Sequence, residues 1–332
     1  MLGAILSLFS AASFALNITA ARRGVVTGTP IQGTAITVPI GVACFLPVAI
    51  AAAQVSHLNA FPPAAAGWMA GVGVLHFLLG RYCNFRANQA AGVNITAPVV
   101  QLQIVVTLVL AVVVLHEPCS ILQMLGAGVM LAGALVTQYQ RPNSSASSGT
   151  AALQRGRAKA TFVPHYLPGY LFASLAALAY GTSPIMARFA LERTGAGGGI
   201  LGGLIAYCAA AVVVAVAMLW PPLRGEVTAI KRENVRWFVY SGVFVAMAQG
   251  FFFAAVAVAP IMVVSPLLQF SLLFRFLFSK LFNPDHEIFG WLVVAGVATS
   301  IVGSLAVAAD TDTILRFLSV PEWLAAALRW HF

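Results

Sequence analysis

Polar side chains interrupt two apolar stretches of this 332-residue chain in nearly the same order. The earlier stretch contains Pro98, Gln101, Gln103 and Thr107. The later stretch contains Ser265, Pro266, Gln269, Ser271 and Arg275. Amides, hydroxyls and a guanidinium can bind a polar or anionic solute, and a proline frees a backbone carbonyl and bends a helix. The two stretches therefore predict a solute path through a membrane.

Helical spacing divides the polar residues of the later stretch into two faces. Residues four apart share one face of a helix, so Ser271, Arg275 and Ser279 form a stripe, with Gln269 about 120° away. In the earlier stretch Gln103 and Thr107 occupy the positions of Ser271 and Arg275. Pro266 and Gln269 thus belong to a shared framework, and the unshared Arg275 is the better candidate for specificity.

Arg81 and Arg275 both fall within apolar stretches, at a similar depth of roughly 20 Å from the start of the helix. Two interpretations stand for these arginines. Their long side chains can extend to the nearer membrane interface. Alternatively, they line a polar cavity and bind an anionic group, because a buried charge in a membrane usually has a function.

Neutral polar residues complete the set of candidates. His76, Gly80 and Asn84 share a helical face, and Gln249 is the nearest counterpart in the second half of the chain. A histidine in a membrane helix either bonds between helices or relays protons. The predicted cavity residues are Asn17, His76, Asn84, Gln101, Gln103, Thr107, Tyr180, Ser183, Gln249, Gln269, Ser271 and Arg275.

The composition is that of an all-α integral membrane protein. Hydrophobic residues make up 60% of the chain and charged residues 8%, against about 25% charged in soluble domains. Segments of roughly 20 apolar residues can cross a bilayer. Such segments lie near 3–21, 34–55, 67–87, 94–115, 120–139, 168–187, 199–220, 237–257, 261–282 and 288–308. The first segment lacks a basic leader and is expected to be retained.

The segments repeat in the same order. Residues 14–22 match residues 180–188, and Gly126 with Gly133 match Gly296 with Gly303. We therefore expect a first half at 1–140, a polar basic linker at 141–165, a second half at 166–309 and a tail at 310–332. Five spans in each half give the two halves opposite orientations, an arrangement typical of secondary transporters with a substrate site between the repeats.

The tail at 310–332 is either an interfacial helix or disordered. Most Lys and Arg residues fall in the odd-numbered loops, which places those loops in the cytoplasm and both termini outside. The net charge of +9 thus reflects membrane orientation, and no nucleic-acid partner is expected. The expected partners are a solute and the lipid bilayer, with the protein a monomer or homodimer in the plasma (inner) membrane.

The nine acidic residues all fall in loops or at helix ends, so no carboxylate is expected at the middle of the membrane. Proton-coupled pumps for cations normally need such a carboxylate. The four cysteines are scattered singly, without metal-binding spacing. No sequence motif of a hydrolase, nucleotide-binding protein or metalloenzyme occurs. We therefore expect no enzyme, no cofactor and no metal.

The segment at 115–133 carries a family resemblance, together with Ala97 and Pro98. Glu117, Gln123, Gly126 and Gly133 fall at characteristic positions, with a weaker copy from Ser265 to Gly303. The chain resembles the EamA-type proteins of the drug/metabolite transporter superfamily. This resemblance implies ten helices in two repeats around a central cavity made mainly by helices 1, 3, 4, 6, 8 and 9. It also implies cytoplasmic termini, opposite to the charge distribution.

These observations together predict a secondary transporter. We expect it to export a small polar neutral or anionic metabolite, such as an amino acid, by alternating access between the repeats. The alternatives are a proton-coupled multidrug efflux transporter, a membrane-embedded enzyme and a scaffold that transports nothing.

Overall fold

The computed structural model of the chain is built from helices, and no strand occurs among the residues that it describes. These are residues 2–116, 120–139, 163–191, 198–258, 270–284, 290–308, 311–317 and 321–329, with 194, 267–268 and 319. The helices of the first half are α1 (Leu2–Thr27), α2 (Pro30–Ala51), η1 (Gln54–Ala60), α3 (Pro63–Val72), η2 (Gly73–Gly80), α4 (Arg81–Ala91), α5 (Val93–Val100), α6 (Gln103–Leu115) and α7 (Ile121–Tyr139). Those that follow are α8 (Tyr166–Leu191), α9 (Gly198–Ala217), α10 (Pro221–Thr228), α11 (Arg232–Val258), α13 (Ser271–Phe282), α14 (Trp291–Ala308), α15 (Thr311–Phe317) and α16 (Glu322–Leu328).

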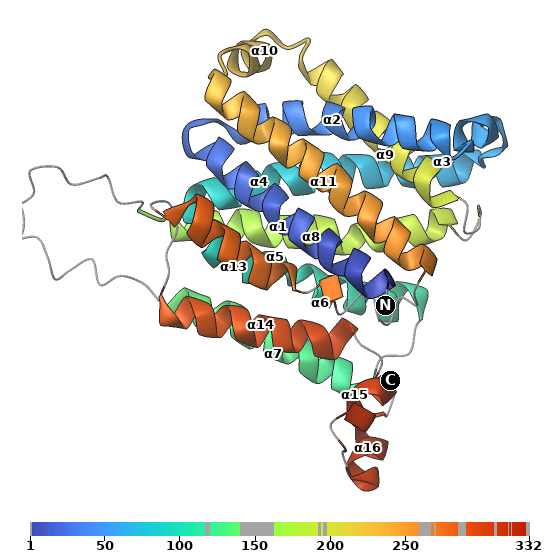
Figure 1. The fold of residues 1–332 in the computed structure, drawn as a ribbon, viewed down its shortest axis with the longest axis vertical. Helices are drawn as coiled ribbons and strands as arrows, with labels where there is room; N and C mark the ends of the chain where they lie inside the picture. Colours follow the sequence, from blue (N-terminus) through green and yellow to red (C-terminus); the bar gives the residue numbers. More distant parts are fainter. Residues whose placement is uncertain are drawn as a thin grey trace, which may run out of the picture.

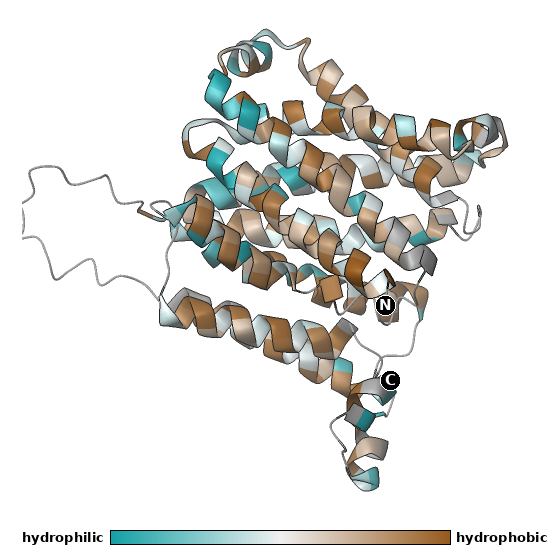
Figure 2. Cartoon of the chain, viewed as in Figure 1, coloured by the Kyte–Doolittle hydropathy of each residue, from teal (hydrophilic) through white to brown (hydrophobic). Residues whose placement is uncertain are grey.

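The predicted all-α membrane fold is confirmed. Seven of the described helical stretches are long and apolar enough to cross a membrane, and two shorter apolar helices lie in α7 and α14. Hydrophobic residues run along the helices, while hydrophilic residues gather at helix ends and in α10 (Figure 2). The count of ten spans stays a prediction, because part of the segment at 261–282 lies outside the described residues.

Two of the predicted spans are interrupted. The third span is a continuous helix from α3 to α4, whose middle, η2, is a π-helix. The fourth span breaks at Gln101 and Leu102 between α5 and α6. Pro98, inside α5, cannot donate a backbone hydrogen bond, and the amide N–H of Leu102 bonds to the Val99 carbonyl in a tighter turn. The break therefore follows the proline by one turn.

The helices of the two halves interleave (Figure 1). Helix α1 packs against α11 and α13, while α8 packs against the third span and α6. Helix α2 contacts α11, and α9 contacts α3 and η2. Two further pairs join like positions of the halves, α2 with α9 and α7 with α14. The pattern of pairings thus stays the same when the two halves are exchanged.

Helices α7 and α14 form a pair along one edge of the bundle (Figure 1). Their backbones approach closely at glycines: a Cβ atom at Gly133 would lie 2.4 Å from Ser300 Oγ, and one at Gly303 would lie 2.6 Å from the Gly126 carbonyl oxygen. Small residues allow such close packing in membranes, where dispersion contacts drive helix association. The glycines matched between the halves therefore serve this helix pair.

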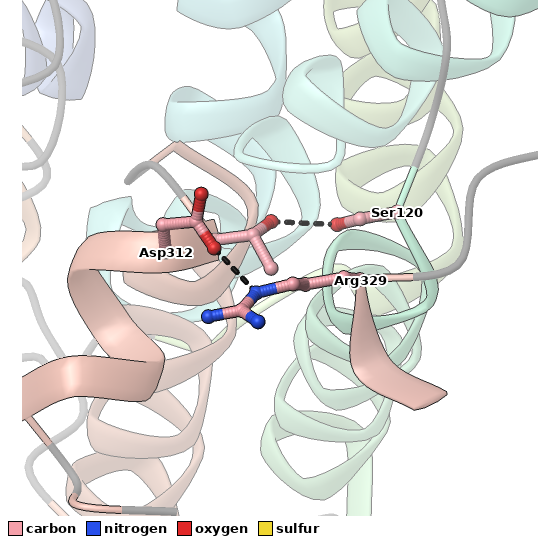
Figure 3. A network of polar contacts seen from close by, with 4 residues as sticks. Ser120, Asp312 and Arg329 are labelled. Carbon is pink, nitrogen blue, oxygen red and sulfur yellow. Dashed lines mark hydrogen bonds and ion pairs between the residues drawn. The ribbon is translucent and has the colours of Figure 1, made fainter. Parts of the chain in front are cut away.

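The N-terminus of α7 is capped by Ser120. Ser120 Oγ accepts from the Gln123 amide at 3.2 Å, and Gln123 Oε1 accepts from the Ser120 amide at 3.0 Å. The same serine is hydrogen-bonded to Thr311 at the start of the tail. Arg329 bonds Asp312 at 2.6 Å beside it (Figure 3). The described parts of the tail are thus helical and attached to the end of α7.

Several predicted features fall outside the described residues. These are Glu117, Ser265, Pro266, Gln269 and most of the linker at 141–165. The domain boundaries and the membrane orientation stay predictions. Helix α10, in the loop between α9 and α11, was not predicted. Its first residues are Pro221 and Pro222, and proline is favoured in the first turn of a helix.

Candidate substrate cavity

A cavity of about 330 Å³ lies between the two halves of the chain. Its described walls come from α1, η2, α4, Val100, Gln101 and α6 on one side and from α8, α11, Leu268 and α13 on the other. Around the cavity, α4 and α6 contact α8, and α1 contacts α11 and α13. The cavity therefore lies at the interface between the halves, and movement of one half against the other would change the shape of the cavity.

Helices α6 and α13 bring polar side chains to the cavity from their first turns. Gln103 and Thr107 of α6, and Ser271 and Arg275 of α13, all line it. Gln103 Nε2 donates to Gln101 Oε1 at 3.1 Å, which joins the two amides across the break in the fourth span. The interruption thus places a pair of amides in the wall instead of burying them in a regular helix.

Arg275 and Thr107 use their polar atoms differently. The Thr107 hydroxyl lies 2.9 Å from the Gln103 carbonyl and 2.8 Å from the Gly181 carbonyl of α8, so it can donate to either. Arg275 Nε is buried and has no hydrogen-bond partner among the described residues. Because an unsatisfied buried donor costs about 1–3 kcal/mol, Arg275 is ready to bind an acceptor that enters the cavity.

His76 is held by contacts with α8. Its Nδ1 lies 2.7 Å from Ser183 Oγ, and Ser183 donates to the Tyr180 carbonyl at 3.0 Å. Ser183 has one hydroxyl proton, so the tautomer of His76 decides whether Ser183 donates to the imidazole or accepts from it. The Tyr180 ring lies 4.5 Å from the imidazole. Gly80 makes room for it, because a Cβ atom there would come within 2.7 Å of Tyr180.

The π-helix explains why Arg81 joins His76 in the cavity wall. The amide N–H of Arg81 bonds to the His76 carbonyl, five residues earlier, as in a π-helix. A regular α-helix would rotate Arg81 about 140° away from His76, which is why only His76, Gly80 and Asn84 were expected on one face. Arg81 lines the cavity, which was one of its two interpretations from the sequence, although the predicted set of cavity residues did not include it. π-helical turns are common at functional sites.

Asn17 and Gln249 bring amides from α1 and α11. Asn17 Oδ1 accepts a hydrogen bond from Ser241 Oγ at 2.6 Å. Because Ser241 belongs to α11, this bond also joins helices of the two halves. The Asn17 amide NH2 group is a donor, so this residue can contribute a neutral donor to the wall.

The described wall of the cavity contains two guanidinium groups and no carboxylate. The described acidic residues lie in α10, at the start of α11 and in the tail. They are Glu226, Glu233, Asp312 and Glu322. Placing an uncompensated charge away from water costs several kcal/mol. A negatively charged ligand in the cavity would offset these charges, and the amides and hydroxyls around it could orient such a ligand.

Beyond the cavity, a network of hydrogen bonds joins α1, α4 and α5. Arg22, which is 1% exposed, donates from Nη1 to the Asn88 carbonyl at 2.5 Å. Asn88 Oδ1 accepts from Thr96 Oγ1 at 2.7 Å, and Asn88 Nδ2 donates to Asn84 Oδ1 at 3.3 Å. Asn84 lines the cavity. The network thus extends from the cavity wall to residues one turn further along both helices.

All of the predicted cavity residues except Ser183 and Gln269 line this cavity. Ser183 stands behind the wall and holds His76, because its hydroxyl is used within α8. Gln269 lies outside the described residues. The sequence reasoning missed the apolar part of the wall. Its members are Phe14, Ile18, Phe85, Val100, Ile104, Pro184, Val245 and Leu268. Apolar residues in a membrane helix give no signal that separates a cavity wall from a lipid contact.

Among the described residues, no group of three or more His, Cys, Asp or Glu side chains could hold a metal ion. Cys44, Cys83 and Cys208 are free and lie on separate helices. The polar groups of the cavity are suited to recognise a solute by hydrogen bonds and charge.

Comparison with known proteins agrees with this architecture. Residues 1–139 match the model of the EamA-like transporter family. A solved crystal structure, described only as that of a protein, aligns with a TM-score of 0.51 and 20% identity, over 95% of this chain and 98% of that chain. At this identity the likeness concerns the fold alone. No curated protein matches the chain. The predicted resemblance to the EamA family is confirmed over residues 1–139: the chain is a multi-pass membrane protein whose first half matches the EamA-like transporter family.

Proposed function

We propose that the protein exports a small polar metabolite with a negatively charged group, such as an amino acid, across the plasma (inner) membrane. The observation that carries this proposal is Arg275. Its Nε is a buried donor without a partner among the described residues, in a cavity whose described wall has no carboxylate. Arginine binds a carboxylate through parallel hydrogen bonds, and the neighbouring amides and hydroxyls can orient the rest of the solute.

Transport would proceed by alternating access between residues 1–140 and 166–309. The exchange-symmetric helix pairings support two related halves, and the cavity between them supports a substrate site at their interface. The network around Arg22 and Asn88 supports a state in which one end of the cavity is closed. Rocking of the halves would break this network and form a comparable closure at the other end.

Transport by proteoliposomes tests the proposal. The purified protein is reconstituted, and uptake of amino acids and other carboxylic acids is measured for the wild type, Arg275→Ala and Arg224→Ala. Arg224 is the matched control because it is an exposed arginine of α10. We expect uptake of one or more carboxylates that Arg275→Ala reduces and Arg224→Ala leaves unchanged. Equal uptake by all three proteins would remove Arg275 from the site.

A further inference from the structure

Arg81 is the second arginine of the cavity, and aromatic rings hold it from one side. Its side chain is 6% exposed. The guanidinium carbon Cζ lies 5.4 Å from the centre of the Phe77 ring and 5.7 Å from that of Tyr207. Nη2 donates to the Tyr207 hydroxyl at 3.3 Å. Because cations are attracted to aromatic faces, these contacts fix the orientation of the guanidinium.

Tyr207 belongs to α9, which contributes no residue to the described wall of the cavity. Its ring is fully buried and stacks on Phe77, with centroids 3.8 Å apart and planes 12° apart. Gly41 of α2 provides the space, since a Cβ atom there would lie 2.1 Å from the Tyr207 ring. The packing of α2 and α9 thus positions a tyrosine whose polar contact is with Arg81.

The other terminal nitrogen of the Arg81 guanidinium, Nη1, makes no hydrogen bond to a described residue. Nη1 is buried and has no hydrogen-bond partner among the described residues, although Arg81 lines the cavity. Arg275 Nε, from the wall of the same cavity, is also buried and has no hydrogen-bond partner among the described residues. Both arginines line the same cavity of about 330 Å³, so both charges act on one small volume. No described side chain of the wall offsets either charge.

The two arginines approach the cavity from different helices, α4 and α13, so each can present its guanidinium to a separate negative group. An unpaired buried charge is costly, so pairing both guanidiniums would be stabilising. A solute with two negative groups would provide an acceptor for each. The cavity volume of about 330 Å³ is at the small end of the range for ligand pockets, which fits a compact solute.

We propose that Arg81 forms a second anion subsite, positioned by Tyr207, and that the preferred solute carries two negatively charged groups, one bound by Arg275 and one by Arg81. This proposal rests on the function proposed above. The second group is either a carboxylate or a phosphate, since a guanidinium binds both in the same way. Tyr207 acts only through Arg81, so it is a positioning residue.

Matched pairs of probes test the number of charges. Uptake into proteoliposomes and thermal stabilisation of the purified protein are measured with L-aspartate against L-asparagine, succinate against succinamate, and O-phospho-L-serine against L-serine. Within each pair the size is similar or the parent molecule is the same, and the second negative group is removed. We expect at least one doubly charged probe to be favoured about tenfold or more over its partner. The pair that shows the preference distinguishes a carboxylate from a phosphate.

Variants then assign the preference to Arg81. Arg81→Gln should abolish the preference by lowering uptake of the doubly charged probe, and Arg81→Lys should restore part of it. Tyr207→Phe should raise the KM for the doubly charged probe about threefold to tenfold without lowering kcat, because it removes one hydrogen bond that orients Arg81. Arg86→Gln is the matched control, an exposed arginine of the same helix, and should change neither.

Failure of this inference differs from failure of the proposed function. If no doubly charged probe is favoured over its partner in the wild type, the second subsite is refuted, while dependence of a singly charged probe on Arg275 would preserve the transporter proposal. A preference that survives in Arg81→Gln would also refute it. If Arg81→Gln does not fold, the KM of Tyr207→Phe decides, and an unchanged KM for the doubly charged probe counts against the inference.

Discussion

Helices α6 and α13 begin at matching positions of the two halves and differ in what their second polar residue does. Thr107 of α6 is hydrogen-bonded to the Gly181 carbonyl of α8 and so holds two helices together. Arg275 of α13 has a buried Nε without a described partner. The two matched helices thus differ: the Thr107 hydroxyl contributes to packing, and we propose that Arg275 supplies a charge for a ligand.

Helices α7 and α14, in contrast, carry the same residue type, glycine, at their matched positions. These helices keep matching glycines because they pack against each other, with Gly126 close to Gly303 and Gly133 close to Gly296 and Ser300. A large residue at any of these positions would separate the helices. The matching glycines thus lie where α7 and α14 face each other, and the differing residues Thr107 and Arg275 lie where α6 and α13 face the cavity. The predictions below test this division, in order of decreasing expected effect.

Arg275→Thr gives α13 the residue that α6 has, and it should produce the largest effect. A hydrogen bond to a charged group contributes about 1.5–3 kcal/mol, and 1.4 kcal/mol corresponds to tenfold. We expect kcat/KM of a transported carboxylate to fall about 10- to 100-fold, with the thermal stability of the ligand-free protein unchanged or raised. A variant that loses stability but keeps its kcat/KM would show that Arg275 is a structural residue.

Gly133→Leu should destabilise the protein by about 1–3 kcal/mol, because overpacking forces neighbouring groups apart. A Cβ atom at Gly133 would already lie 2.7 Å from the Ser300 backbone nitrogen. Gly128→Leu, in the same helix, is the control, since nothing lies within 4 Å of a Cβ atom there. Thermal unfolding in detergent measures both. Equal losses of stability in the two variants would contradict close packing of α7 on α14.

Arg275→Lys keeps the positive charge and removes the planar fork of the guanidinium. We expect a loss of about tenfold in kcat/KM for the carboxylate, smaller than that of Arg275→Thr, because one hydrogen bond to a charged group is weakened while the long-range attraction remains. Dose–response uptake measurements separate KM from kcat. If lysine is no better than threonine, the site needs the fork itself and the charge alone contributes little.

Thr107→Val should have the smallest effect. Interhelical hydrogen bonds in membrane proteins contribute about 0.6 kcal/mol on average, and valine has nearly the same shape as threonine. We expect a small decrease in thermal stability, from loss of the contact with the Gly181 carbonyl, and an unchanged KM. A marked increase in KM would show that Thr107 binds the solute, and the division of work between α6 and α13 would then be wrong.

The sequence predicted much of the cavity because polar residues are rare in apolar helices and recur at helical spacing. Ser271 with Arg275, and Gln103 with Thr107, line the cavity together as the four-residue spacing suggested. Arg81 was assigned to no face, because the π-helix that rotates it toward His76 leaves no mark in the sequence. Hydrogen-bond partners were not predictable either. Ser183 was expected in the wall, but its contacts with His76 and the Tyr180 carbonyl place it behind.

The fold was predicted to a similar extent. Apolar length predicted the seven described stretches that can cross a membrane, and Pro98 indicated the irregular fourth span. The pairing of α1 with α11 and of α7 with α14 depends on how side chains fit between distant helices, which composition and spacing do not encode. Helix α10 was missed because it is short and polar, so it has neither the length nor the hydrophobicity of a span.

Ligand-induced thermal stabilisation tests the central claim most directly, because a ligand that binds the folded protein raises its apparent stability. The purified wild type and Arg275→Thr are screened against the same library of cationic, neutral and anionic metabolites. The account predicts that the compounds that stabilise the wild type carry a carboxylate or phosphate and that they fail to stabilise Arg275→Thr. Stabilisation by cations, or equal stabilisation of both proteins by anions, would contradict it.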